Sequence, residues 1–390
     1  MTDFTLSRRG FLASACCLAA APILTPVTFA SMPGDKRFVT IVLRGAMDGL
    51  ALVQPYGDVG FAAFRPTLAL TPETGLIDLD GHFGLHPSAA DLMPLWRSRE
   101  LAFVHAVSTP YRDQRSHFDG QDMLESGGEH VSEEKTGWLN RALAVIPRSD
   151  ARKAIDVNTS TELILTGPNN VDVWASDSNL GPARDETQFL QRLYAGDPAF
   201  AKAMEEATRA NSASMVAEPG GPRGQKVADV AALAGNMLKG DYRIASFSIT
   251  GWDTHVGQIG QFKRPVQDLT EAITTLKSTL GPDIWSKTVV LAMTEFGRTV
   301  RENGSGGTDH GTGGCAVLAG GAINGGRILG RWPGLGDHQL LDERDLAPTA
   351  DVREIAAAML YRQFDVTVDD LTAKIFPGVT FDKGSQFLRA

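Results

Sequence analysis

The stretch Phe38-Val39-Thr40-Ile41-Val42-Leu43 is a continuous apolar run, and it decides the fold. Apolar and polar residues do not alternate along it, so the strand that it predicts has no face open to water. Strands buried on both faces are typical of α/β proteins, in which helices cover both sides of a parallel sheet. The run therefore indicates an α/β fold.

Strand and helix signals alternate in the rest of the chain. Apolar, β-branched runs predict further strands at 101–107, 242–250 and 288–293. The stretch 258–280 predicts a helix between the last two, an order that implies right-handed crossovers and parallel pairing. We therefore expect a three-layer α/β/α sandwich with a mostly parallel, doubly wound sheet. It would form one domain over residues 31–390, with a helical insertion at 184–240.

The composition limits the classes of function. The chain has 390 residues, of which 43% are hydrophobic and 21% charged, enough to bury a large core. Its formal net charge is -9. Nucleic-acid binding depends on clustered Lys and Arg that release counterions, so we expect no nucleic-acid partner.

The amino terminus resembles a twin-arginine export signal. Arg8 and Arg9 precede an apolar stretch over residues 11–30, which ends in the small-residue pattern Thr28-Phe29-Ala30. We expect residues 1–30 to be a signal peptide that is cleaved near Ala30. The twin-arginine translocase would then be a partner during export, and the mature protein would be periplasmic or secreted.

An uncleaved membrane anchor is the alternative interpretation of this segment, and Pro22 and Pro26 disfavour it. We expect no stable membrane span in the mature chain. Cleavage would also remove Cys16 and Cys17 and leave Cys315 without a disulfide partner. Cys315 lies in an apolar run and is expected to be an inert, buried thiol.

Acidic residues and histidines follow apolar runs at separate places in the second half of the chain. They are Asp253 and His255, then Glu295, then the adjacent pair Asp309-His310. The carboxyl ends of parallel strands converge at one edge of an open α/β sheet, where such folds bind ligands. Imidazole and carboxylate groups are suitable ligands for a divalent metal, most simply zinc or manganese. We therefore expect one or two metal ions at this edge.

Structural roles are open at the same positions. Asp48, just past the first strand, is a metal ligand or a helix cap. Glu295 could pair with Arg298, and His117 could be a surface or core histidine without a ligand. The metal-site interpretation depends on several such residues following separate predicted strands.

Five segments resemble the bacterial domain-of-unknown-function 1501 family. They are Leu43-Arg44-Gly45-Ala46-Met47-Asp48-Gly49-Leu50, Ser116-His117-Phe118, Gly251-Trp252-Asp253-Thr254-His255, Thr294-Glu295-Phe296-Gly297-Arg298-Thr299 and Asp309-His310-Gly311. The resemblance covers nearly the whole chain after the leader. It implies the alkaline phosphatase and sulfatase superfamily, whose members bind two divalent metals above a doubly wound sheet.

The resemblance also implies roles for individual residues. Asp48 resembles the first-strand metal ligand, Asp309-His310 the superfamily's Asp-His pair, and Asp253 with His255 its third cluster. Ser116 is the nearest analogue of the Ser or Thr nucleophile of the phosphatases. The chain has no Cys-x-Pro-x-Arg sequence, so a formylglycine sulfatase is not expected.

Together with the export signal and the expected metal site, this resemblance implies an exported, metal-dependent hydrolase of phosphate or sulfate esters. Ser116, His117 and Arg298 are the catalytic candidates, with Arg298 among the arginines that could hold the non-bridging oxygens. The substrate would be a small-molecule or polymer-borne anionic ester. The alternative is a non-catalytic exported factor that uses the same fold to bind a metal or to assist assembly.

Overall fold

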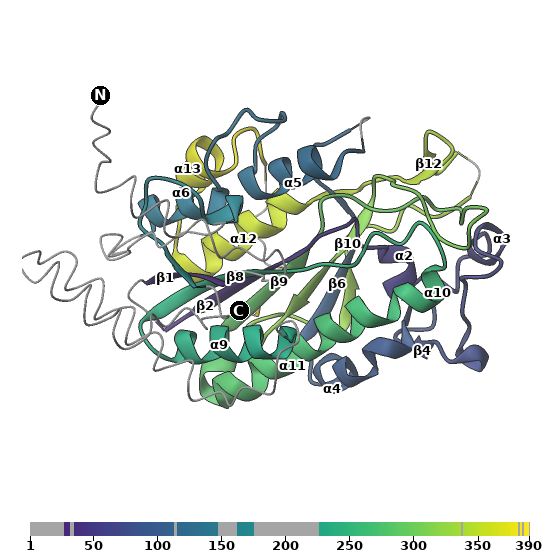
Figure 1. Cartoon of the computed structure of the whole chain (residues 1–390), viewed down its shortest axis with the longest axis horizontal. Coiled ribbons are helices and arrows are strands. Elements are labelled where there is room, and N and C mark those ends of the chain that lie inside the picture. The colour runs from purple at the N-terminus through teal and green to yellow at the C-terminus, as the bar shows by residue number, and fades with distance from the viewer. Residues whose placement is uncertain are drawn as a thin grey trace, which may run out of the picture.

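A computed structural model describes residues 27–31, 35–112, 115–146, 162–174, 226–336, 338–380, 383 and 386–389. This part of the chain is a mixed α/β fold around one large sheet (Figure 1). Most of the predicted insertion at 184–240 lies outside the described residues. Its described portion includes helix α9 (Val227–Lys239), which packs on the sheet.

The large sheet has nine strands in the described residues, in the order β11-β6-β10-β9-β2-β8-β1-β7, with β14 also paired to β6. Their bounds are β1 Val27–Ser31, β2 Arg37–Leu43, β6 Leu101–Ser108, β7 Asp172–Trp174, β8 Tyr242–Ile249, β9 Thr288–Met293, β10 Gly314–Ala319, β11 Arg327–Leu329 and β14 Ala350–Asp351. The strands predicted from the apolar runs are thus confirmed as β2, β6, β8 and β9.

The sheet is mixed, and the expectation of a mostly parallel sheet was wrong. β2 pairs in parallel with β8 and β9, as predicted, but β10 is antiparallel to β9 and to β6, and β1 is antiparallel to β8. The segment 294–313 between β9 and β10 contains no helix. Parallel neighbours need a long crossover, usually a helix, so β10 turns back beside β9 instead.

Helices cover both faces of the sheet, which gives three layers (Figure 1). Every residue of β2 is buried, as its unbroken apolar run predicts. Val39 and Ile41 face α9 and α11 (Lys263–Trp285) on one side, and Phe38 and Val42 face α6 (Trp138–Val145) and α12 (Val352–Phe364) on the other. Each large apolar side chain buried in this way contributes roughly 1.5–3 kcal/mol of transfer free energy.

The remaining elements are short. The helical ones are α2 Gly49–Leu52, α3 Phe61–Phe64, α4 Met93–Arg97, α5 His117–Ser126, α10 Gln258–Gln261, α13 Val368–Asp370, the 3₁₀ turns Pro72–Thr74, Pro87–Leu92 and Leu163–Leu165, and a π-helical turn at Leu371–Ile375. The strands β3 Val53–Gln54, β4 Ile77–Asp78 and β5 Gly84–Leu85 form a small sheet, and β12 Leu340–Leu341 pairs with β13 Asp345–Leu346.

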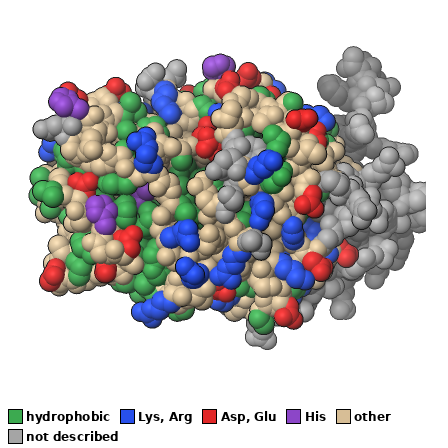
Figure 2. All heavy atoms as spheres, turned by 180° about the vertical axis from the view of Figure 1, so that it is seen from behind, with side chains coloured by type: hydrophobic (Ala, Val, Ile, Leu, Met, Phe, Trp, Pro, Cys, Tyr) green, Lys and Arg blue, Asp and Glu red, His purple; other side chains and the backbone are tan. Residues whose placement is uncertain are grey.

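Several expectations concern the surface and the leader. No helix in the described part of the chain has the length and apolar character needed to cross a membrane. On the face seen in Figure 2, many Lys and Arg side chains lie together over the middle and lower part, and Asp and Glu side chains lie mostly around them. Cys315 is buried and free, and burial raises the pKa of its thiol, as expected of an inert cysteine. Residues 27–30 of the expected leader belong to β1, and cleavage near Ala30 stays a prediction.

Candidate metal centre

The ends of β2 and β8 approach each other closely at one edge of the sheet. After β2 the chain turns through Gly45 (φ +117°) and Ala46 (φ +57°). A Cβ added to Gly45 would lie 2.7 Å from the backbone nitrogen of Asp253, so glycine is required there for space as well as for conformation. This contact brings the segment after the first strand against the predicted Asp253-His255 cluster.

Arg298 ties these segments together. Its side chain is completely buried, and it donates to the carbonyl oxygens of Ala46 (2.8 Å), Gly45 (2.7 Å), Thr308 (2.9 Å) and Trp252 (3.2 Å). It also donates to Asp253 Oδ1 at 2.6 Å. The guanidinium that sequence analysis assigned to substrate oxygens is therefore surrounded by backbone carbonyls and positions Asp253.

Three histidines converge on Asp253. His117, Asp253 and His310 each place one ligand atom within 4.8 Å of the others, and they could hold a metal ion. The Nε2 atom of His117 lies 3.5 Å from Asp253 Oδ2, and those of His255 and His310 lie 3.1 Å and 3.3 Å from Oδ1. His117 begins helix α5, whereas the other residues lie in the loops that follow β8 and β9.

The opposite ring nitrogen of each histidine has a hydrogen-bond acceptor. Nδ1 of His117 donates to Glu295 Oε1 (2.8 Å), that of His255 to Asp309 Oδ1 (3.3 Å) and that of His310 to the carbonyl oxygen of Arg115 (2.9 Å). In the neutral tautomer that results, Nε2 carries a lone pair directed at the cluster. This orientation by carboxylate or carbonyl partners is characteristic of metal-binding histidines.

Two contacts inside the cluster favour a bound cation. The Nε2 atoms of His255 and His310 are 2.9 Å apart, although in these tautomers neither can donate to the other. His117 Nε2 is buried and has no hydrogen-bond partner among the residues that the structure describes. Buried polar atoms are almost always satisfied, and a metal ion would satisfy both groups. The donor set of imidazoles and one carboxylate suits zinc.

Glu295 orients His117. Its side chain is completely buried, and Oε1 accepts from Gly45 N (2.9 Å), His117 Nδ1 and Gln121 Nε2 (3.2 Å), while Oε2 accepts from Thr294 Oγ1 (2.9 Å). Sequence analysis predicted Glu295 as a direct ligand. With these four donors around it, Glu295 is placed behind His117, and Asp309 is placed behind His255 in the same way.

The charges of the cluster are set by these partners. Burial opposes ionisation of Asp253, but the hydrogen bond and charge of Arg298 lower the pKa of this carboxyl to about 2. The hydrogen bond that His117 donates to Glu295 raises the pKa of His117, whereas burial lowers the pKa of His310. Asp253 is therefore ionised, and His310 favours the neutral form that a metal requires.

Asp48 lies in a different environment. It caps α2 through the amide of Ala51 (3.2 Å), and its oxygens accept from Arg65 Nη1 (2.7 Å), Arg65 Nη2 (3.1 Å) and Gln258 Nε2 (2.5 Å). Both Asp48 and Arg65 are almost fully buried. The structure thus gives Asp48 the capping role left open by the sequence and adds a buried ion pair to it.

Ser116 is the N-cap of α5. Its Oγ accepts from the amide of Asp119 at 3.4 Å, and its own amide donates to Tyr111 Oη at 2.8 Å. No hydrogen bond among the described residues joins the Ser116 hydroxyl to the histidine cluster. Its role as a nucleophile stays a prediction.

Sequence analysis considered Arg115 only as one of the arginines that could hold substrate oxygens, and it did not identify Asn303 as part of the site. Arg115 contributes its carbonyl oxygen to His310, and a backbone carbonyl leaves no signal in residue type. Asn303 donates to Asp309 Oδ1 (3.0 Å) and to the carbonyl oxygen of His255 (2.9 Å). The sequence feature that could have indicated Asn303 is its position in a glycine-rich loop, six residues before Asp309.

Fold and site together define a mixed α/β protein with a histidine-rich candidate metal centre at one edge of its sheet. The family described as "Protein of unknown function (DUF1501)" matches residues 105–375, and the chain belongs to this family. No curated protein and no solved structure matches the chain.

Proposed function

We propose that the protein is a metal-dependent hydrolase of phosphate or sulfate esters that uses one divalent ion, most simply zinc. His117, His255, His310 and Asp253 would hold the ion, with Glu295 behind the first of them. The observation that carries this proposal is the convergence of the histidine Nε2 atoms on one carboxylate while each Nδ1 is held from outside. When bound, the ion would supply a Lewis acid that polarises the ester and lowers the pKa of water.

The protein's own residues would prepare the site for this chemistry. Arg298 keeps Asp253 ionised, and Glu295 fixes the ring of His117. His255 and Asp253 remain partly exposed, with side-chain exposures of 38% and 48%, so a substrate could reach them. In this proposal the protein is exported by the twin-arginine translocase, as its leader predicts, and acts on an anionic ester in the periplasm or outside the cell.

The proposal is tested by metal content and activity together. Elemental analysis of the purified protein should find one equivalent of metal, and His310→Ala should lose it, whereas exposed His130→Ala should keep it. The metal-loaded protein should release nitrophenol from a nitrophenyl phosphate, phosphodiester or sulfate. A protein without metal, or a loaded protein inert on all three esters, would contradict the proposal.

A non-catalytic metal-binding factor is the second candidate. It is favoured by the engagement of Ser116 Oγ in capping and of the Arg298 guanidinium by carbonyl groups. Such a factor would retain stoichiometric metal and release no nitrophenol from any of the esters.

A further inference from the structure

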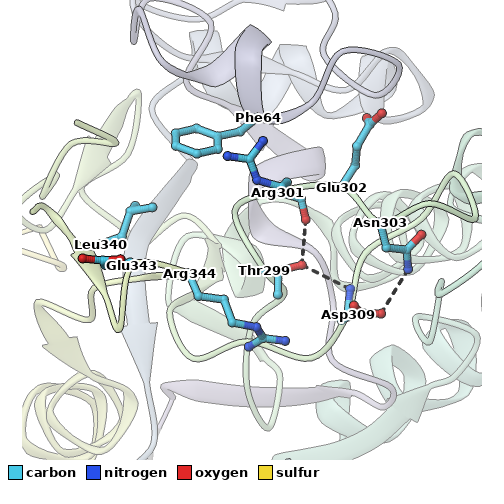
Figure 3. A pocket seen from close by; sticks show the side chains of 9 residues that line it. All are labelled: Phe64, Thr299, Arg301, Glu302, Asn303, Asp309, Leu340, Glu343 and Arg344. Atoms are coloured by element: carbon cyan, nitrogen blue, oxygen red, sulfur yellow. Dashed lines mark hydrogen bonds between the residues drawn. The ribbon is translucent and has the colours of Figure 1, made fainter. Parts of the chain in front are cut away.

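A cavity of about 190 Å³ lies beside the candidate metal centre. Figure 3 shows Arg301 and Phe64 above it, Arg344 below it, and Asn303 and Asp309 together on one side. Asp309 belongs to both places, because its Oδ1 accepts from Asn303 in the cavity wall and from His255 Nδ1 in the cluster. A ligand in the cavity would therefore lie next to the groups that hold His255.

Two arginines supply hydrogen-bond donors to this cavity. The Arg301 guanidinium stacks over the Phe64 ring, with Cζ 4.8 Å from the ring centroid. Stacking uses the face of the guanidinium and leaves the N–H groups at its edge for other partners. Arg344 is fixed at one end by the bond from Nη1 to buried Asp345 Oδ1 (2.8 Å), and its side chain is 35% exposed.

Two of the three carboxylates around the cavity, those of Glu302 and Asp309, accept hydrogen bonds from protein groups. Glu302 accepts from the backbone amides of Thr67 (3.1 Å) and Leu68 (3.1 Å), and Figure 3 shows its carboxylate directed away from Arg344. Asp309 is held by Asn303 and His255. Glu343 is exposed at the opposite side of the cavity from Asp309. The donors that face the space thus belong to arginines, which favours an anionic ligand.

We propose that this cavity is a subsite for a second anionic group of the substrate. The inference rests on the proposed function and narrows it: the ester cleaved at the metal centre carries another phosphate, sulfate or carboxylate, held by forked hydrogen bonds from Arg301 and Arg344. Esters that lack this second anionic group would use the metal centre alone.

Binding to the metal-free protein tests the subsite without any catalytic step. Inorganic pyrophosphate, titrated calorimetrically at low ionic strength, should bind more tightly than inorganic phosphate. Arg301→Gln should weaken pyrophosphate binding about tenfold, the loss expected for one charge-assisted hydrogen bond. Arg327→Gln, an exposed arginine in β11 outside the cavity, is the matched control and should change nothing. Glu343→Gln should tighten binding, because it removes a carboxylate from the rim.

Kinetics of the metal-loaded protein complete the test. Arg301→Gln should raise KM for an alkyl bisphosphate about tenfold and leave KM for nitrophenyl phosphate and the metal content unchanged. Arg344→Gln should raise KM for the alkyl bisphosphate in the same way. If this variant does not fold because it loses the bond to Asp345, Arg301→Gln alone still tests the subsite. Equal binding of pyrophosphate and phosphate, or no effect of Arg301→Gln on either, would overturn the subsite. Failure to hydrolyse any ester, with the binding differences intact, would instead overturn the proposed function.

Discussion

Replacing Glu295 by Gln isolates the charge behind His117. The amide has the shape of the carboxylate, so its oxygen can still accept from Gly45 N, His117 Nδ1 and Gln121 Nε2. Its NH₂ group can donate to Thr294 Oγ1, whose own hydroxyl can donate to the carbonyl oxygen of Leu43 at 2.8 Å. Every buried partner therefore remains satisfied, and the substitution removes little besides the negative charge.

The expected effect follows from the loss of a charge-assisted hydrogen bond. Such bonds are roughly twice as strong as neutral ones, so without this one His117 would be a weaker base and, in the proposed metal centre, a weaker ligand. Changes to the partners of metal-binding histidines typically lower metal affinity by about 10–100-fold. For Glu295→Gln this corresponds to roughly 1.4–2.7 kcal/mol of zinc-binding free energy.

A competition titration against a chromogenic zinc chelator measures this loss. Glu125→Gln is the control. Like Glu295, Glu125 is a buried carboxylate, but it lies on α5 and pairs with Arg44 (2.7 Å) and the amide of Ile164 (3.1 Å) rather than with a histidine. Its zinc affinity should match that of the wild type. A Glu295→Gln affinity within about threefold of wild type, or an equal loss in Glu125→Gln, would refute the assignment of Glu295.

Three further substitutions separate structural from functional roles. Asp48→Asn leaves Arg65 buried without its counter-ion, so chemical denaturation should show an unfolding free energy about 3 kcal/mol lower than that of the wild type. The zinc stoichiometry should stay unchanged, and loss of zinc would instead make Asp48 a ligand. Ser116→Ala removes a helix cap, so it should lower the unfolding free energy by about 1 kcal/mol without abolishing ester hydrolysis. Loss of activity with the metal retained would instead establish Ser116 as the nucleophile. Burial and the nearby charge of Glu125 raise the pKa of Glu162 to about 7, so its contribution to stability is present below pH about 4.5 and is lost as the pH rises through about 7. Between pH 4.5 and 8, the unfolding free energy of Glu162→Gln should therefore rise by up to about 3 kcal/mol relative to that of the wild type. If the two proteins instead lose or gain stability in parallel over this range, the raised pKa of Glu162 is contradicted.

The strands could be predicted because the signal for them is local. The run at 38–43 and the run at 288–293 carry their own burial pattern, and the structure forms β2 and β9 there. The direction of β10 could not be read from its own residues. It depends on the connection before it, the segment 294–313, which contains no helix and therefore does not carry the chain across the sheet to a parallel position.

The residues near the site were easier to predict than their positions relative to an ion. Asp253, His255 and His310 were expected at the edge of the sheet, and they lie together there. Placing Glu295 behind His117 requires the contact of a residue after β9 with the start of α5, which are 178 residues apart. The sequence shows which side chains could be metal ligands, whereas only tertiary packing decides which of them face the proposed ion.

Asp48 is a residue that the sequence suggested as a metal ligand but that tertiary packing directs elsewhere. An acidic residue just past a central strand has the sequence position of a ligand, but the side chain is directed to Arg65 and Gln258, which lie 17 and 210 residues further along the chain. Taking two charges out of water is costly, and pairing in close geometry offsets that cost. The ionic interactions of this sheet edge are thus divided between two functions. Asp48 with Arg65 and Asp253 with Arg298 hold the loops in place, and the latter pair also presents a carboxylate, kept ionised, to three imidazoles. A site that is rigidly supported before any ion binds loses little conformational freedom on binding, which is the physical reason to expect tight metal affinity here.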